Sequence, residues 1–271
     1  MPTYTDTHCH LDFERFDNDR EQVLQRAWDA GLVWILNPGI DLETNQAAIN
    51  LAKAYPGRIS AAVGIHPNHG KQWTAETLEK LKIQAQQAEV VAIGEIGLDY
   101  FRQHTPFDQQ RRMFTDQLEL AAQLGLPVII HNRDAEDDLM AILSAWHGSL
   151  VSTGHPLAER PGVLHSYSAD LATAKKAIAM NFYIGISGPV TFTNAPDRKA
   201  ITSQIPLEHL LLETDAPFLA PHPNRGKRNE PAYIPLIAGE IARLHHVSPE
   251  AVAEQTYANA IRLFDLPAPS N

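Results

Sequence analysis

The stretch QQRRMFTDQLELAAQLGLPVIIH, residues 109–131, joins two kinds of hydrophobic pattern in one unit. Apolar residues recur at three- and four-residue spacing up to residue 124, which predicts an amphipathic helix. Gly125 is a helix-end signal, and the short apolar run PVIIH after it predicts a strand buried on both faces. The strand closes with His131, a side chain that can carry chemistry. This stretch therefore predicts a helix that leads into a buried strand with a functional residue at its end.

The same unit recurs along the chain. Short apolar runs fall at residues 4–8, 33–37, 60–64, 90–95, 127–131, 162–165, 182–186 and 209–213. Helical patterns that end at Gly lie between several of them, for example DNDREQVLQRAWDAG and ETNQAAINLAKAYPG. Eight alternating strands and helices predict an α/β protein, a closed (β/α)8 TIM barrel that forms a single domain over residues 1–271. An open, doubly wound sheet is the alternative.

Composition is typical of a soluble globular protein, with 44% hydrophobic and 20% charged residues. No apolar run reaches the roughly 18 residues of a membrane span, and the first residues lack a secretory pattern, so we expect a cytoplasmic protein. The single cysteine, Cys9, excludes an intramolecular disulfide and is expected to be a buried thiol. The net charge of −10 opposes bulk attraction of a polyanion. A nucleic-acid substrate therefore requires metal ions or a local basic patch.

Polar residues of metal-binding type follow the predicted strands. The six residues are His8, His10, Glu95, His131, His165 and Asp215. Barrel enzymes build their active sites from these carboxyl ends of the strands. Each residue alone has an ordinary explanation, such as a helix cap or a hydrogen-bonded loop residue. Six of them at one rim instead predict a shared site.

Their residue types predict a pair of divalent ions. His8 and His10 share one face of a strand, so both imidazoles can reach one ion. Six ligands exceed the needs of one tetrahedral ion with an open position, and two ions that share a carboxylate fit better. We assign His8, His10, Glu95 and Asp215 to one ion, and Glu95, His131 and His165 to the other. Such donors suit Zn, Mn, Fe or Co, with Mg less suited to the histidines, and the identity stays open.

An ordered set of motifs resembles the TatD family of metal-dependent hydrolases. The motifs are THCHLD (7–12), GIHP (64–67), GEIGLDY (94–100), PVIIHNRDA (127–135), VLHSYS (163–168) and ETDAPFLAPHPNRGKRNEP (213–231). The resemblance runs from about residue 4 to the predicted final helix at 257–267. It implies an amidohydrolase-like TIM barrel that acts as a divalent-metal deoxyribonuclease, cleaving phosphodiester bonds of DNA from a 3′ end, in cytoplasmic DNA repair or turnover. The family's metal ligands fall on the six residues named above.

Three residues are expected to carry the catalysis. Glu95 is expected to bridge the ions, and Asp215 both to ligate and to accept a proton from the attacking water. His66 is placed to contact a phosphate oxygen or the leaving group, and a hydrogen bond within the Pro67 turn is the alternative.

Four basic residues are expected to contact substrate phosphates, namely Arg133, Arg225, Lys227 and Arg228. Ion pairs with neighbouring acidic residues or a solvated loop are the alternatives for them. Tyr100, Phe101 and Tyr167 are candidates for base stacking, and packing explains them equally well.

Three departures from the family pattern bear on substrate range. Asn68 and then His69 follow Pro67, where the family commonly has histidine directly. Residues 166–169 replace a stretch with Phe and Gly, which alters the expected floor of the substrate groove. The segment 146–162 is longer than usual, and its His155 is expected to be a surface-loop residue because it precedes a strand.

Other classes of function remain open at this point. One is a metal-dependent amide, ester or lactone hydrolase of a small molecule, and another is a non-catalytic barrel stabilised by metal. The second is disfavoured because a structural site closes its coordination. Neither a membrane nor an obligate protein partner is expected. The sequence leaves open the choice between DNA and RNA, between exonuclease and endonuclease, and the oligomeric state.

Overall fold

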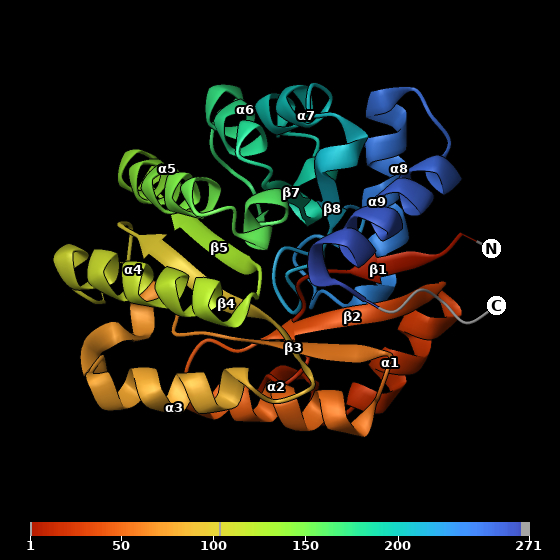
Figure 1. Ribbon diagram of the computed structural model, residues 1–271. Helices are drawn as coiled ribbons and strands as arrows, with labels where there is room; N and C mark the ends of the chain where they lie inside the picture. Colours follow the sequence, from red (N-terminus) through yellow and green to blue (C-terminus); the bar gives the residue numbers. More distant parts are fainter. Residues whose placement is uncertain (1, 103, 267–271) are drawn as a thin grey trace.

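A computed structural model describes residues 2–102 and 104–266, in which eight strands form one parallel sheet in chain order (Figure 1). The strands are β1 (Tyr4–Asp6), β2 (Leu32–Pro38), β3 (Ile59–Val63), β4 (Val90–Asp99), β5 (Val128–Arg133), β6 (Gly162–Leu164), β7 (Tyr183–Ile186) and β8 (Leu210–Leu212). All eight predicted strands are present, with ends shifted by up to four residues. The predicted domain of residues 1–271 and the predicted final helix both extend into residues outside the described part, and the extent of the domain stays a prediction.

The sheet closes on itself between its last and first strands. The Thr7 amide donates to the Leu212 carbonyl at 3.0 Å, and the Asp215 amide donates to the His8 carbonyl at 2.9 Å. Cys9 and Ala216 form an isolated parallel bridge just beyond the two strands. The structure is therefore a nearly closed (β/α)8 barrel, as predicted, and the open doubly wound sheet is wrong.

Helices surround the barrel (Figure 1). They are α1 (Arg20–Asp29), α2 (Leu42–Ala54), α3 (Ala75–Ala85), α4 (Phe107–Leu124), α5 (Glu136–Ser152), α6 (Leu171–Ala179), α7 (Pro196–Thr202), α8 (Ile234–His245) and α9 (Pro249–Phe264). In α4, Met113, Phe114, Leu118 and Ala121 form the buried stripe that the periodicity predicts. The helix ends at Gly125, whose φ of 70° is the left-handed conformation that glycine adopts readily.

The interior of the barrel is packed with side chains. One apolar cluster takes a residue from each of β2 to β8, among them Leu36, Ile129 and Leu211. The end of α9 adds Phe264 to this cluster, with its ring 5.4 Å from that of Trp34. The barrel is thus a filled core, and the chemistry is left to the residues at the strand ends. No helix among the described residues is both long and apolar enough to cross a membrane.

Candidate metal centre

The barrel brings all six predicted ligands together at the carboxyl ends of its strands. His8 and His10 follow β1, Glu95 and His131 lie within β4 and β5, and His165 and Asp215 lie beyond β6 and β8. Most of them are buried, with His8 fully enclosed. Five of the six, all except His8, line a pocket of about 430 Å³.

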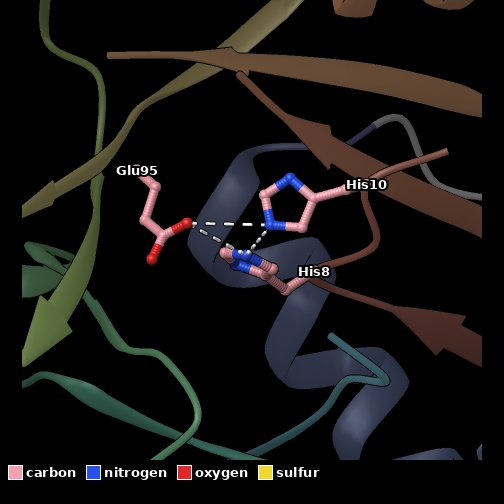
Figure 2. Close-up of side chains that lie close together, drawn as sticks. All are labelled: His8, His10 and Glu95. Carbon is pink, nitrogen blue, oxygen red and sulfur yellow. Dashed lines mark hydrogen bonds and ion pairs between the residues drawn. The ribbon is translucent and has the colours of Figure 1, made fainter. Parts of the chain in front are cut away.

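Two histidine nitrogens and a carboxylate oxygen form the first group (Figure 2). Nε2 of His8 lies 3.2 Å from Nε2 of His10, and Oε2 of Glu95 lies 3.5 Å and 3.7 Å from these two atoms. Oδ1 of Asp215 lies 3.9 Å from the first nitrogen and 3.8 Å from the second. Ligands of a tetrahedral ion with bonds of about 2.0–2.2 Å stand about 3.3–3.6 Å apart, which is close to this spacing.

The hydrogen bond of His10 leaves its other ring nitrogen free to accept, on the side that faces the two carboxylates. Nδ1 of His10 lies 3.2 Å from the Pro38 carbonyl, which can only accept, so this nitrogen carries the proton of the neutral ring. Nε2 therefore presents a lone pair toward Glu95 and Asp215, whose carboxylate oxygens also accept. Acceptors that converge in a buried space repel one another unless a cation lies among them.

A second group surrounds the other oxygen of Glu95. Oε1 lies 2.8 Å from Nδ1 of His131, 3.5 Å from Nε2 of His165 and 3.6 Å from Nε2 of His66. Glu95 thus directs one oxygen to each group, which is the arrangement expected of a shared ligand. The structure also brings His66 into the second group, closer to the centre than the sequence predicted.

Gly97 lets β4 and β5 approach each other beside this group. Its φ is 142°, a conformation that other residues rarely adopt, and a Cβ atom there would lie 2.0 Å from the His131 carbonyl oxygen. The second glycine of the GEIG motif, Gly97, is therefore required for the close approach of β4 to the backbone that carries His131.

Asp99 positions His131, and Asn68 positions Asp99. Oδ2 of Asp99 lies 3.4 Å from Nε2 of His131 and accepts a 2.8 Å hydrogen bond from the Asn68 side chain. Its Oδ1 accepts from the amides of Phe101 and Arg102. Burial opposes the ionisation of Asp99, but these partners, His131 first, hold its pKa below its usual range. The departure at Asn68 thus has a role in supporting the site.

Glu213 is a functional candidate that the sequence reasoning missed. It is fully buried, its Oε1 lies 3.2 Å from Nδ1 of His165, and it also accepts a hydrogen bond from the Ser166 amide. Burial lowers the pKa of His165, but the carboxylates of Glu213 and Glu95 outweigh it and raise the value to about 10. The available signal was its position two residues before Asp215, at the end of the last strand.

Burial keeps most of the other histidines neutral, the form that binds metal. It holds the pKa of His8 well below the usual range, and it lowers the pKa of His10 to about 4 and that of His66 to about 3. Burial also raises the pKa of Asp215 to about 7, against the opposing effect of His165. A carboxyl group with this pKa can exchange a proton near neutral pH.

The predicted phosphate contacts are placed in different ways. Arg133 lines the pocket, and its guanidinium lies 4.1 Å from the centre of the Phe101 ring. Arg225, Lys227 and Arg228 do not line it. Arg225 donates to the Asn194 side chain, whereas Arg228 makes a bidentate pair with Asp19 at 2.7 Å.

Two candidates for base stacking pack instead against the protein. The Tyr100 ring stacks on Phe107, and its hydroxyl donates to Asp138. Tyr167 is buried and donates its hydroxyl to the Asp170 carbonyl. Only Phe101 of the three candidates is exposed, at 59%, and the guanidinium of Arg133 packs over its ring.

The other departures from the family pattern lie beside the centre or away from it. Ser166 bonds to Ser187 through their hydroxyls at 2.9 Å, and Ser168 and Ala169 line a separate cavity. The long segment 146–162 forms the end of α5 and a short 3-10 helix, Pro156–Glu159. Its His155 caps that helix by accepting from the Leu157 amide. This segment leads into the amino end of β6, opposite the end that carries His165.

A closed (β/α)8 barrel whose strand ends gather imidazoles and carboxylates defines the class of metal-dependent barrel hydrolases. The TatD related DNase family matches residues 5–265, and the chain belongs to this family.

Similar proteins span the whole chain. An uncharacterized metal-dependent hydrolase of Bacillus subtilis, YabD, is 41% identical over 96% of this chain and 98% of its own length. The 3′-5′ ssDNA/RNA exonuclease TatD of Erwinia billingiae is 39% identical over 97% and 99%. The crystal structure of YjjV, a TatD homologue of Escherichia coli K12, superposes with a TM-score of 0.88 at 33% identity, covering 97% and 98%.

These findings confirm the predicted family and a metal-dependent hydrolase of the TatD DNase type. They favour this class over a small-molecule amide or ester hydrolase and over a non-catalytic barrel.

Proposed function

We propose that this protein is a divalent-metal-dependent 3′–5′ exonuclease that removes nucleotides from single-stranded DNA. The observation that carries the proposal is Glu95, whose two carboxylate oxygens face two separate groups of histidine nitrogens. The exonuclease activity printed in the name of the Erwinia relative supports the substrate class, and that name includes RNA as well as DNA. We place the activity in the cytoplasm, which agrees with a single, buried cysteine.

We infer that the centre holds two divalent ions, with Zn, Mn and Mg as the candidates. His8, His10, Glu95 and Asp215 would hold one, and Glu95, His131 and His165 the other. A pair of bound divalent ions in such a site supplies electrophilic activation of the phosphoryl group and of the attacking water. The convergent, unprotonated donor atoms of His10 and the carboxylates support this assignment.

Asp215 and His66 handle protons and hydrogen bonds at the phosphate. Asp215 keeps part of its side chain exposed in the pocket, so its carboxylate is placed to accept a proton from the attacking water. Nδ1 of His66 accepts from the Asn68 amide at 3.1 Å, so the neutral ring carries its proton on Nε2, which faces the centre. That N–H can donate to a phosphate oxygen or to the leaving group.

Arg133 is the basic residue best placed for the substrate. Its guanidinium lines the pocket and, among the described residues, has no carboxylate within ion-pair distance. Its planar fork can therefore bind a phosphate of the strand. Contacts from Arg225, Lys227 and Arg228 to a longer stretch of backbone stay a prediction.

The test begins with elemental analysis of the purified protein. Chelator-treated protein is then supplied with Mg, Mn or Zn and assayed on 3′- and 5′-labelled single strands and duplexes of DNA and RNA. We expect metal in the purified protein and stepwise shortening of single strands from the 3′ end.

His8→Ala should lose both metal and activity, which excludes a contaminating nuclease. The matched control is His147→Ala, because His147 lies on α5, does not line the pocket, and forms a hydrogen bond to the Ala158 carbonyl. Intact oligonucleotides with all three metals, from protein that binds them, would refute the exonuclease.

A further inference from the structure

Three apolar side chains form one side of the pocket that contains the metal-ligand candidates. We call Phe13, Phe218 and Leu219 the aromatic shelf. The Phe13 ring stacks on the ring of His10, with centroids 4.6 Å apart, and the Phe218 ring lies 6.1 Å from Phe13 at 81°. Phe218 is 43% exposed and Leu219 40%. Large apolar surface is thus open to solvent directly beside a ligand candidate.

The loop that carries the shelf is held in place from beneath. The buried side-chain amide of Asn229 donates to the Phe218 carbonyl at 2.6 Å and to the Thr214 carbonyl at 2.8 Å. Leu219 has a φ of 54°, a left-handed conformation that is disfavoured for a branched side chain. Its carbonyl oxygen lies against Gly188, where a Cβ atom would come within 1.9 Å. A fold keeps such a residue only where its surroundings determine the backbone, so the shelf is preorganised.

The pocket has a different chemical character away from the shelf. Arg102, His104 and Arg133 line it and are exposed. The pocket therefore offers an apolar surface, a group of metal-ligand candidates and basic side chains to one bound molecule. Its volume of about 430 Å³ lies within the range of sites for single small molecules.

We propose that the aromatic shelf binds the unpaired base of the terminal nucleotide, with Phe218 as its stacking surface. This inference rests on the proposed exonuclease function and names the part of the substrate that the site recognises. A nucleotide matches the pocket because it joins an apolar, planar base to an anionic phosphate. The base would lie on Phe218 while its phosphate faces Glu95 and Arg133.

Stacking on one ring accounts for a preference for unpaired ends without a preference for sequence. Every base has an aromatic face, so an aromatic side chain accepts all four. A paired base is already stacked within its duplex and must leave it before it can lie on Phe218. The shelf thus selects frayed or single-stranded ends, and the identity of the base matters little.

The test compares two metal-loaded reactions that differ only in the terminal base. One single strand ends in an ordinary 3′ nucleotide, and the other ends in a tetrahydrofuran residue that keeps the phosphate and lacks the base. Base stacking on aromatic residues contributes about 1–3 kcal/mol, so wild-type kcat/KM for the first cleavage should be about 5- to 160-fold lower on the abasic end. Phe218→Ala should lower kcat/KM on the ordinary end by the same factor and leave the abasic end unchanged. Phe218→Tyr should restore the discrimination.

The matched control is Ile83→Ala, because Ile83 is 62% exposed on α3 and does not line the pocket. Equal wild-type rates on the two ends would refute base binding by the aromatic shelf and leave the proposed exonuclease activity unaffected. An equal loss on both substrates in Phe218→Ala would also overturn it, because that result indicates a structural role. Failure of the wild type on both substrates would refute the proposed exonuclease itself.

Discussion

One carboxylate oxygen of Glu213 lies 3.2 Å from Nδ1 of His165, and the opposite ring nitrogen lies 3.5 Å from Glu95. Since Glu213 is fully buried and also accepts the Ser166 amide, its position is fixed. Its carboxylate thus lies behind His165, in the position from which carboxylates orient metal-binding histidines in other proteins.

Glu213→Gln should lower metal affinity or activity by about 10- to 100-fold, because an amide cannot replace the charge that orients His165. Competition with a chelating dye measures the affinity, and oligonucleotide cleavage measures the activity. Glu119→Gln, an exposed change on α4, is the control. Wild-type affinity and activity in Glu213→Gln would show that His165 needs no such partner.

Asn229→Ala should destabilise the fold by about 1–3 kcal/mol, because the change leaves two carbonyls, those of Thr214 and Phe218, without their donor. Urea unfolding measures this loss. The KM for single-stranded DNA should rise as well, since the shelf loses its support. Asn50→Ala on the exposed face of α2 should change neither quantity. A normal KM in a destabilised Asn229→Ala protein would show that the loop of Phe218 and Leu219 does not contribute to substrate binding.

Arg133→Ala should affect the binding of single-stranded DNA, whereas Arg228→Ala should affect the stability of the fold. Arg133 lines the pocket, so its loss should weaken single-strand binding and reduce the slope of log affinity against log salt by about 0.7. Arg228 is held by Asp19 and lies 4.7 Å from the Phe16 ring, so its loss should lower the melting temperature and leave the salt slope unchanged. Fluorescence anisotropy over a salt series measures the slope. A reduced slope in Arg228→Ala would restore this residue as a phosphate contact.

Asp41→Ala should cost about 1 kcal/mol of stability, because Asp41 caps α2 through the Thr44 amide. The hydrogen bond from His69 has the largest effect on the pKa of Asp41 and lowers it below its usual range. Burial opposes this shift, and hydrogen bonds from Thr44 add to it. A lowered folded-state pKa means that the stabilisation is present above the unfolded pKa of about 4 and is lost as the pH falls below it. Urea unfolding of both proteins should therefore show a smaller difference at pH 3 than at pH 5. A difference that grows on acidification would contradict this sign.

The sequence was sufficient for the barrel because its strands are buried on both faces. Such strands appear as nearly continuous apolar runs, as in VVAIGE, and their order along the chain is their order in the sheet. The six ligand candidates could be predicted for the same reason, because the carboxyl ends of parallel strands meet at one rim.

The other features of the site depend on the direction of side chains and on partners that are distant in sequence. Residue patterns along the chain do not indicate either of these. Glu213 and Asp215 both follow β8, and only the coordinates show that Glu213 turns toward His165. Phe218 is 43% exposed beside a residue in the left-handed conformation, Leu219, and residue patterns indicate neither feature. The sequence predicts Arg228 as a phosphate contact, and only the structure shows its pair with Asp19, which lies 209 residues away in sequence.

The seam where the barrel closes also joins the first and the last ligand candidates along the chain, since the Asp215 amide bonds to the His8 carbonyl. On this ligand assignment, a ribosome must synthesise the first 215 of the 271 residues before the final donor can reach the first ones. A growing chain that stops short of Asp215 therefore carries histidines but no working cleavage centre.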